Sequence, residues 1–404
     1  MNFSLRIFCV AVSLIVSLQT TSSLAQINVF VDWADFEARL NEATASAGVA
    51  NFTAGEVVTI KSNVFNDITS HYSGFSLNFT ETNPGGDYET IVFGLTTTGS
   101  GYGRADSIDF RNLLKTGTGR VFTANFDDFI ESSDARSVQI AELSTSLAGT
   151  ASHELGHNLG LQPLDAYGIA SFTATDFNGG YTTGDAQNAH VMATGFTGLT
   201  ESGREVYRTF SDLSGVKLHM AEGVSPNPIT VTSEVGSSHS SAATAQHLDL
   251  TSVAFASEYD DAELLEGFFS GSDYYSVDLE AGDKILIEVL SEIIYSNDFD
   301  SLLRFYDTDG TTVMFENDDL EVNSSGVNNG GPYSMDAMLW NLPVDAAGRY
   351  FIEVDSFGSG DSGNYHMAVA VARFQAIPEP SAILFLSAVL GSAAMRRRRR
   401  SSSC

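Results

Sequence analysis

The sequence predicts two structured regions, an α+β region followed by an all-β region. Within residues 26–222, segments with the apolar spacing of helices alternate with short segments of strand-like alternation, which is typical of an α+β fold. Residues 223–242 are rich in Ser, Thr, Pro and Gly, and we expect them to form a linker. In residues 243–373 apolar residues recur with a period of two between Gly and Asp turns, which favours a β-sandwich.

The individual elements follow from the same periodicities. In the first region the helical segments are 33–45, 57–72, 140–159 and 210–220, and the strand segments are 75–80, 88–95 and 120–125. In the second region the strand segments are 274–279, 284–290, 302–306, 312–315, 350–354 and 365–371. No internal repeat is evident.

Composition excludes several classes of function. The 404 residues include 51 Asp and Glu against 20 Lys and Arg, for a net charge of −31. A body this acidic is repelled by nucleic-acid phosphates, so we expect no nucleic-acid partner. The two cysteines, Cys9 and Cys404, lie at the ends of the chain. A disulfide framework is therefore not expected, and any metal ion must be held by His, Asp or Glu.

The N-terminal residues 1–25 have the parts of a secretory signal peptide. Arg6 precedes an apolar run, and the segment ends in Ser23-Leu24-Ala25, a small-x-small pattern suited to cleavage. The alternative is a buried N-terminal helix, which these flanks disfavour. The signal predicts that the protein is exported.

The C-terminal residues 377–404 combine Pro378-Glu379-Pro380, a short apolar run over 381–395 and a cluster of five arginines at 396–400. The run barely reaches the length of a transmembrane helix, and the arginines would stay on the cytoplasmic side. This order resembles the PEP-CTERM sorting tail of Gram-negative bacteria. The resemblance implies an exosortase partner and a cell-surface or secreted product, whereas the alternative is an ordinary membrane anchor.

The C-terminal segment carries the only cluster of positive charge, Arg396 to Arg400. Six arginines lie in the two end segments, so 14 basic residues remain against 51 acidic ones in the body between them. The basic cluster is therefore interpreted as a sorting signal and not as a binding patch.

One motif carries recognisable chemistry, H-E-x-x-H from His153 to His157. In a helix, positions i and i+4 share one face, so both imidazoles can bind one ion. Glu154 lies beside them, placed to act on a water and not to bind the metal. Two imidazoles with an oxygen ligand suit Zn²⁺. The pattern therefore predicts zinc-assisted peptide hydrolysis, with Glu154 as general base and later as proton donor.

The extended motif resembles that of the metzincin proteases, which implies an α+β zincin catalytic domain and a third metal ligand after the helix. Gly160 matches the glycine at which the chain turns out of the helix. At the third-ligand position the sequence has Pro163, which offers no donor atom. We expect Asp165 to replace it, with His190 as the alternative.

A second segment, residues 188–195, resembles the metzincin Met-turn. The resemblance implies that Met192 lies beneath the metal. Glu201 and Glu205 remain open as distant ligands of the kind found in gluzincins.

The all-β region resembles the pre-peptidase C-terminal (PPC) domain, a jelly-roll-like sandwich that accompanies secreted proteases. The resemblance rests on residues 273–283, 303–310, 317–319, 348–354 and 363–365. It implies a non-catalytic role in secretion or in contact with a substrate or the extracellular matrix. Asp307 and Asp309, with Asn317 to Asp319, could bind Ca²⁺, although hairpin turns use the same residue types.

The leading functional hypothesis is an exported zinc endopeptidase acting on a protein or peptide substrate. A second hypothesis is a surface or matrix-associated binding protein that retains a zincin fold but has lost its full ligand set, because Pro163 stands at a ligand position. A third is a metal-dependent hydrolase of another polymer. Metal content and casein hydrolysis discriminate between these hypotheses.

Overall fold

The computed structural model describes most of the chain between its two terminal segments. The described residues are 26–94, 101–162, 190–195, 199–226, 228–236, 239–252, 259–295, 299–318, 336–358 and 361–373. The predicted signal peptide and the predicted sorting tail lie outside these residues. Among the described helices, none has both the length and the apolar character that crossing a bilayer requires.

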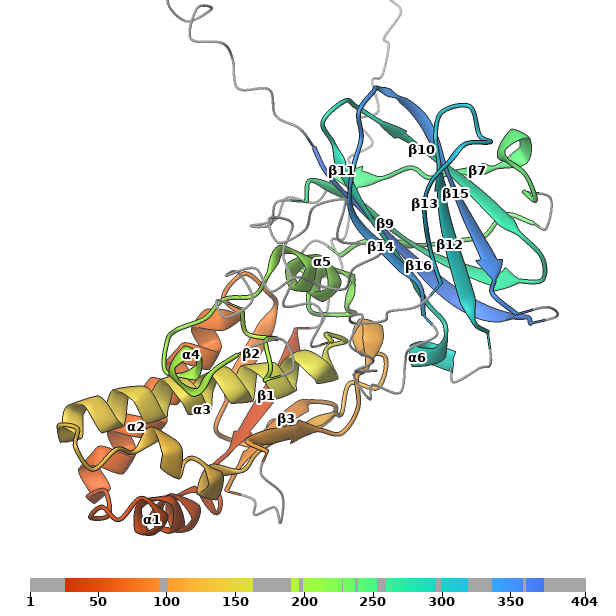
Figure 1. Cartoon of the computed structure of the whole chain (residues 1–404). Coiled ribbons are helices and arrows are strands. Elements are labelled where there is room, and N and C mark those ends of the chain that lie inside the picture. The colour runs from red at the N-terminus through yellow and green to blue at the C-terminus, as the bar shows by residue number, and fades with distance from the viewer. Residues whose placement is uncertain are drawn as a thin grey trace, which may run out of the picture.

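The first region is a five-stranded sheet with helices packed against it (Figure 1). The strand order is β2-β1-β3-β5-β4, in which β2, β1, β3 and β5 are parallel and the edge strand β4 is antiparallel to β5. The strands are β1 (Ile27–Asp32), β2 (Leu77–Thr80), β3 (Glu89–Phe93), β4 (Gly103–Ala105) and β5 (Thr118–Val121). The helices are α1 (Phe36–Ser46), α2 (Ala54–His71), α3 (Arg136–Asn158), α4 (Glu201–Arg204) and α5 (Asp212–Met220).

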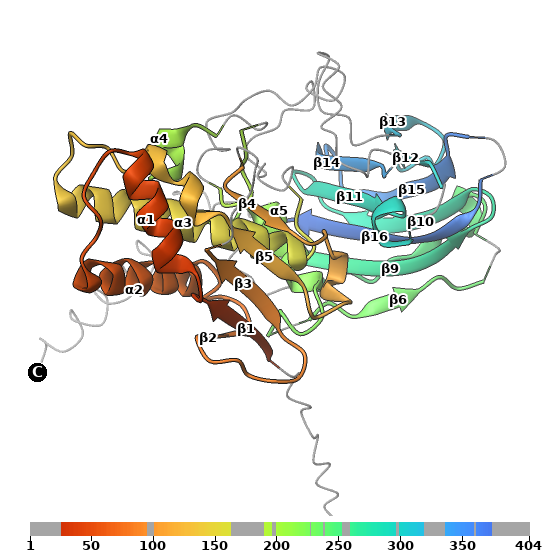
Figure 2. The same cartoon turned by 90° about the horizontal axis from the view of Figure 1, so that it is seen from below.

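Helices α2 and α3 lie side by side in both views (Figures 1 and 2). The start of α2 is set by a capping box, in which Thr53 Oγ1 accepts from the Glu56 amide and Glu56 Oε2 accepts from the Thr53 amide. Apolar residues of both helices share one core with β1, β3 and β5; Ile60, Val64, Leu147 and Leu155 are fully buried in it. This core holds α3, and with it the H-E-x-x-H motif, against the sheet.

The second region is a sandwich of two sheets. One has the order β13-β12-β15-β10-β7 and the other β14-β11-β16-β9-β6, with β8 also paired to β9. The strands are β6 (Val231–Ser233), β7 (Gln246–His247), β8 (Thr251–Ser252), β9 (Asp261–Phe269), β10 (Asp273–Leu279), β11 (Lys284–Leu290), β12 (Ser301–Tyr306), β13 (Val313–Asn317), β14 (Met338–Pro343), β15 (Gly348–Ser356) and β16 (Gly363–Ala372). A short helix, α6 (Glu292–Tyr295), follows β11. The inner faces of the sheets form a separate core that includes Tyr275, Ile287, Phe305 and Val369.

The two regions meet through α5, which lies against the outer face of the six-stranded sheet (Figure 2). Leu213 and Val216 of α5 pack with Leu264 of β9 and Leu286 of β11 in a third apolar cluster. Because this sheet is covered on both faces, strands such as β16 are buried along nearly their whole length. The two regions therefore share a packed interface.

A buried ion pair crosses this interface. Lys217 Nζ of α5 lies 2.8 Å from Glu288 Oε1 of β11, and the two side chains are 1% and 0% exposed. Burying two charges is compensated only when they are paired. Lys217 and Glu288 therefore set the position of α5 on the sheet.

The predicted linker needs a correction. Val231–Ser233 within residues 223–242 form β6, which pairs in parallel with β9, and Glu234 continues the pairing through its amide to the Glu266 carbonyl. A short strand with this composition is stabilised by its partner and not by its own propensity. Part of the stretch predicted as linker is thus a strand of the sandwich.

Candidate functional site

The two histidines of the motif face each other on the last turns of α3. His153 Nε2 and His157 Nε2 are 3.0 Å apart. Each Nδ1 lies on a backbone carbonyl, His153 Nδ1 at 3.1 Å from Val191 O and His157 Nδ1 at 2.7 Å from Leu161 O. Both rings are thereby held in one orientation.

These contacts assign the tautomers. A carbonyl oxygen only accepts, so each Nδ1 must carry the proton, and in a neutral ring Nε2 then presents a lone pair. Burial lowers the pKa of His153 well below its usual value, so this ring is neutral at pH 7. The 3.0 Å between the two Nε2 atoms suits an N–H···N hydrogen bond if one ring gains a second proton, and it places both nitrogens beside one cation if both rings are neutral. The donor set and its second contacts on backbone carbonyls fit a zinc ion.

Glu154 lies on the same helix, between the helix and the edge strand β4. The residue is 6% exposed. A Cβ built at Gly103 would lie 2.5 Å from Glu154 Oε1, and one at Gly119 would lie 3.0 Å from Glu154 Cβ. Glycine at these two strand positions therefore makes room for the carboxylate. Burial raises the pKa of Glu154 to about 8, while the Ala105 amide and Arg204 act in the opposite direction.

The chain turns out of α3 at Gly160, as the motif predicts. Gly160 has φ +97°, a conformation that L side chains rarely adopt, and a Cβ there would lie 2.7 Å from the Phe110 Cα. The Leu161 amide donates to the Gly156 carbonyl, which closes the helix. This turn brings the Leu161 carbonyl to His157.

The segment around Met192 packs against the histidine-bearing turn of α3. Met192 is fully buried, and a Cβ built at Gly156 would lie 2.7 Å from its sulfur. The preceding residue, Val191, provides the carbonyl that holds His153. Met192 therefore lies against the backbone of Gly156, a residue between His153 and His157 in the sequence.

Arg208 is a functional candidate that the sequence analysis missed. The residue is 2% exposed, and Nη1 donates to the carbonyls of His190 and Val191 at 3.3 and 3.4 Å. A Cβ at Gly149 would lie 2.4 Å from Arg208 Nη2, so the side chain lies against α3. Burial lowers the pKa of Arg208 to about 10. By holding the 190–191 backbone, Arg208 orients His153 indirectly.

Arg204 was also missed. Its guanidinium carbon lies 5.0 Å from the centre of the Tyr102 ring, next to β4. Arg204 also interacts electrostatically with Glu154. A positive charge therefore lies near the carboxylate, although α4 gave no motif by which sequence reasoning could identify it.

Some candidates for the third ligand lie within the described residues, and others lie outside them. Pro163 and Asp165 lie outside it. Among the described residues, His190, Glu201 and Glu205 are not brought into a three-residue ligand group with His153 and His157. The His190 Nδ1 is buried without a hydrogen-bond partner, and its backbone bridges to Thr209. Asp165 stays a prediction.

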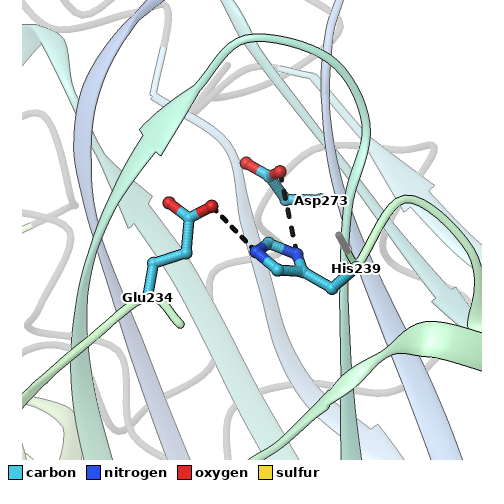
Figure 3. A group of neighbouring side chains, drawn as sticks. All are labelled: Glu234, His239 and Asp273. Atoms are coloured by element: carbon cyan, nitrogen blue, oxygen red, sulfur yellow. Dashed lines mark hydrogen bonds and ion pairs between the residues drawn. The ribbon is translucent and has the colours of Figure 1, made fainter. Parts of the chain in front are cut away.

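A different ligand group is present in the sandwich. Glu234, His239 and Asp273 place one potential ligand atom each within 4.8 Å of one another (Figure 3). Glu234 and His239 belong to the stretch predicted as linker, and Asp273 is the first residue of β10. The motif histidines are not part of this group. Sequence reasoning missed it because the three residues are scattered over 40 positions without a known spacing.

Two of the predicted calcium residues, Asp307 and Asp309, serve a hairpin turn, whereas Asn317 ends β13 and its Nδ2 donates to the Met338 carbonyl. Asp309 accepts from the amides of Thr311 and Thr312 and from the Thr312 hydroxyl, and these bonds lower its pKa to about 2. Asp307 accepts from the Thr308 amide. Asp319 lies outside the described residues. The turn accounts for both aspartates without a bound ion.

Comparison with known proteins shows weak structural likeness and no sequence match. No family model and no curated protein matches the sequence. The pre-peptidase C-terminal domain of a Bacillus anthracis collagenase is similar at 16% identity and a TM-score of 0.19, over 35% of this chain and 96% of that chain. The Aeromonas hydrophila protein PliG, a periplasmic inhibitor of g-type lysozyme, is similar at 12% identity and 0.21, over 35% and 97%.

A zinc protease is also among the similar structures. High choriolytic enzyme 1, a hatching enzyme from Oryzias latipes, has 14% identity and a TM-score of 0.17, over 39% of this chain and 51% of that chain. Because all three TM-scores are low, no family is assigned from these likenesses.

Proposed function

We propose that the protein is an exported zinc-dependent endopeptidase whose active site is His153, Glu154 and His157. The observation that carries this proposal is the pair of Nε2 atoms 3.0 Å apart, each ring held through Nδ1 by a carbonyl. When both rings are neutral, this arrangement presents two Nε2 lone pairs to one cation. Asp165 is the first choice for the third ligand and His190 the second.

The proposed division of labour follows from position. Bound zinc would polarise the scissile carbonyl and acidify a water molecule. Among the described residues, Glu154 does not form a three-residue ligand group with the two histidines. Its side chain lies on the side of α3 that packs against β4. Without a cation its pKa of about 8 keeps Glu154 protonated at pH 7, and a bound zinc ion would lower this pKa, so that the carboxylate could accept a proton from the attacking water and deliver it to the leaving amine.

The edge of the sheet supports a peptide as the substrate class. Strand β4 is the last strand in the sheet order and pairs only with β5 among the described strands. An extended peptide can add to such an edge through backbone hydrogen bonds. Since Gly103 of β4 adjoins Glu154, a peptide bound there would pass the carboxylate. Arg204 beside Tyr102 would contribute positive charge to the same edge of the sheet.

Export, the sorting tail and the matrix contact remain part of the proposal. The signal peptide and the Pro-Glu-Pro tail predict passage through the inner membrane and handling by an exosortase. The sandwich is proposed to act as a PPC-like accessory domain. The excess of acidic residues in the body between the two terminal segments suits solubility outside the cell.

The test is metal analysis together with casein hydrolysis by residues 26–377. The proposal predicts zinc bound to the wild type, hydrolysis that a chelator removes, and zinc retained without hydrolysis in Glu154→Gln. In His153→Ala both zinc at this site and hydrolysis should be lost. Absence of zinc and of hydrolysis in the wild type would favour the alternative of a surface binding protein. Hydrolysis of polysaccharide in place of casein would favour the third hypothesis.

A further inference from the structure

The Glu234, His239 and Asp273 group lies where the chain enters the sandwich (Figure 3). Glu234 directly follows β6, and its amide donates to Glu266 O of β9 in the six-stranded sheet. Asp273 is the first residue of β10 in the five-stranded sheet. His239 lies between them, and its carbonyl accepts from the Tyr274 amide at 2.7 Å. The three side chains therefore connect the two sheets.

Both carboxylates are held by donors on their far side. Glu234 Oε2 accepts from the Phe268 amide at 2.7 Å, and Asp273 Oδ2 accepts from the Tyr365 hydroxyl at 3.1 Å. The remaining oxygens face His239, with Glu234 Oε1 at 2.8 Å from Nε2 and Asp273 Oδ1 at 3.8 Å from Nδ1. Outer contacts of this kind are what orients ligands in metal sites.

His239 has a buried nitrogen that the protein leaves unbonded. Its side chain is 3% exposed, and Nδ1 has no hydrogen-bond partner. The 3.8 Å to Asp273 Oδ1 is too long for a hydrogen bond, but it is close to the spacing between two ligands of one ion. A buried polar atom without a partner costs free energy, so this nitrogen indicates a missing ligand.

The charge of the group also favours a bound cation. Two carboxylates with side chains 13% and 10% exposed adjoin one imidazole. Like charges in a site with little water are stabilised by a cation between them. Among cations, those of the zinc class accept imidazole together with carboxylate oxygen, whereas Ca²⁺ takes six to eight oxygen ligands.

We propose that Glu234, His239 and Asp273 form a second metal site, which takes a divalent transition cation of the zinc class and does not depend on the H-E-x-x-H motif. One oxygen of each carboxylate and one ring nitrogen of His239 bind the ion. The ion fixes Glu234 and His239 onto both sheets. Its role is to join the incoming chain to the sandwich.

The test uses the full chain carrying His153→Ala and His157→Ala, so that zinc at the motif cannot contribute. Equilibrium dialysis followed by elemental analysis should find about one zinc per chain. Adding His239→Ala should reduce this to about zero. Adding His247→Ala should leave it unchanged. His247 is the matched control, because its imidazole also lies near two carboxylates, Asp249 and Asp278, but is 37% exposed.

A second variant keeps the test decisive if His239→Ala does not fold. Asp273→Asn keeps an acceptor for Tyr365 but removes one charge, and it should weaken zinc binding at least tenfold with an unchanged circular dichroism spectrum. Zinc should also raise the melting temperature of the parent and not that of either variant. No zinc in the parent, zinc retained in His239→Ala, or calcium bound in place of zinc would each overturn the proposal. A parent without zinc would identify the group as a hydrogen-bonded contact that only joins the two sheets.

Discussion

The two histidine-containing groups of this protein are built in opposite ways. In the α+β region, His153, Glu154 and His157 come from one turn of α3, and backbone carbonyls orient the two rings. In the sandwich, Glu234, His239 and Asp273 come from three segments that the sheets bring together. The first group depends on a helix and the second on tertiary pairing. A local spacing is therefore visible in the sequence, and a group assembled by the fold is not.

The largest expected effect is a loss of catalysis when Glu154 is replaced in the His153, Glu154 and His157 group. Glu154→Gln should lower kcat for casein or a quenched peptide by about 10²- to 10⁴-fold, because general acid–base catalysis by one side chain contributes that much. Zinc content should not change, since Glu154 is not among the ligands. Full activity in this variant would remove Glu154 from the mechanism.

The interface between the regions provides the next effect. Lys217→Met leaves Glu288 charged and buried, and it should lower the free energy of unfolding by about 3–5 kcal/mol. The double variant Lys217→Met/Glu288→Met replaces both charges with apolar groups and should recover most of this loss. Urea unfolding of the two variants measures both values. A double variant as unstable as the single one would show that the pair is not coupled.

A buried carboxyl at the start of β3, that of Glu89, predicts that the free energy of unfolding depends on pH. Glu89 is fully buried, and burial together with Asp109 raises its pKa to about 8, while the Gly117 backbone acts in the opposite direction. Between its unfolded and folded pKa values, Glu89 is protonated when folded and ionised when unfolded. Its stabilising contribution is thus complete at low pH and decreases as pH rises towards 8.

Glu89→Gln should remove this dependence. Between about pH 5 and 7 the wild type should lose roughly 2–3 kcal/mol through Glu89, and the variant should not. Glu37→Gln on the exposed side of α1 is the control. Chemical denaturation at several pH values measures the slopes. Equal slopes in wild type and Glu89→Gln would contradict the assignment.

The smallest expected effect concerns the space around Glu154. Gly103→Ala places a Cβ 2.5 Å from Glu154 Oε1, so the carboxylate must shift, and kcat should decrease about tenfold with zinc retained. Gly101→Ala is the matched control, because the nearest atom to its Cβ is 3.8 Å away. Similar kinetics for both glycine variants would show that β4 does not position Glu154.

Much of the fold follows from local patterns. Helix α3 was predicted over 140–159 and spans Arg136–Asn158, and the predicted strands 274–279 and 284–290 are β10 and β11. Strand β9 was not predicted, because Asp-Ala-Glu-Leu-Leu-Glu has helical composition and its pairing with β16, β6 and β8 makes it a strand. The role of Gly160 was predictable from a motif, whereas burial of Lys217 against Glu288 depends on residues 71 positions apart.

Zinc at the end of α3 is the central claim, and anomalous diffraction at the zinc edge tests it most directly. Crystals grown with zinc should show a peak about 2.0–2.1 Å from both His153 Nε2 and His157 Nε2. A third contact from Asp165 or His190 in the same map would complete the ligand set. A map with ordered His153 and His157 side chains and no peak between them would contradict the claim.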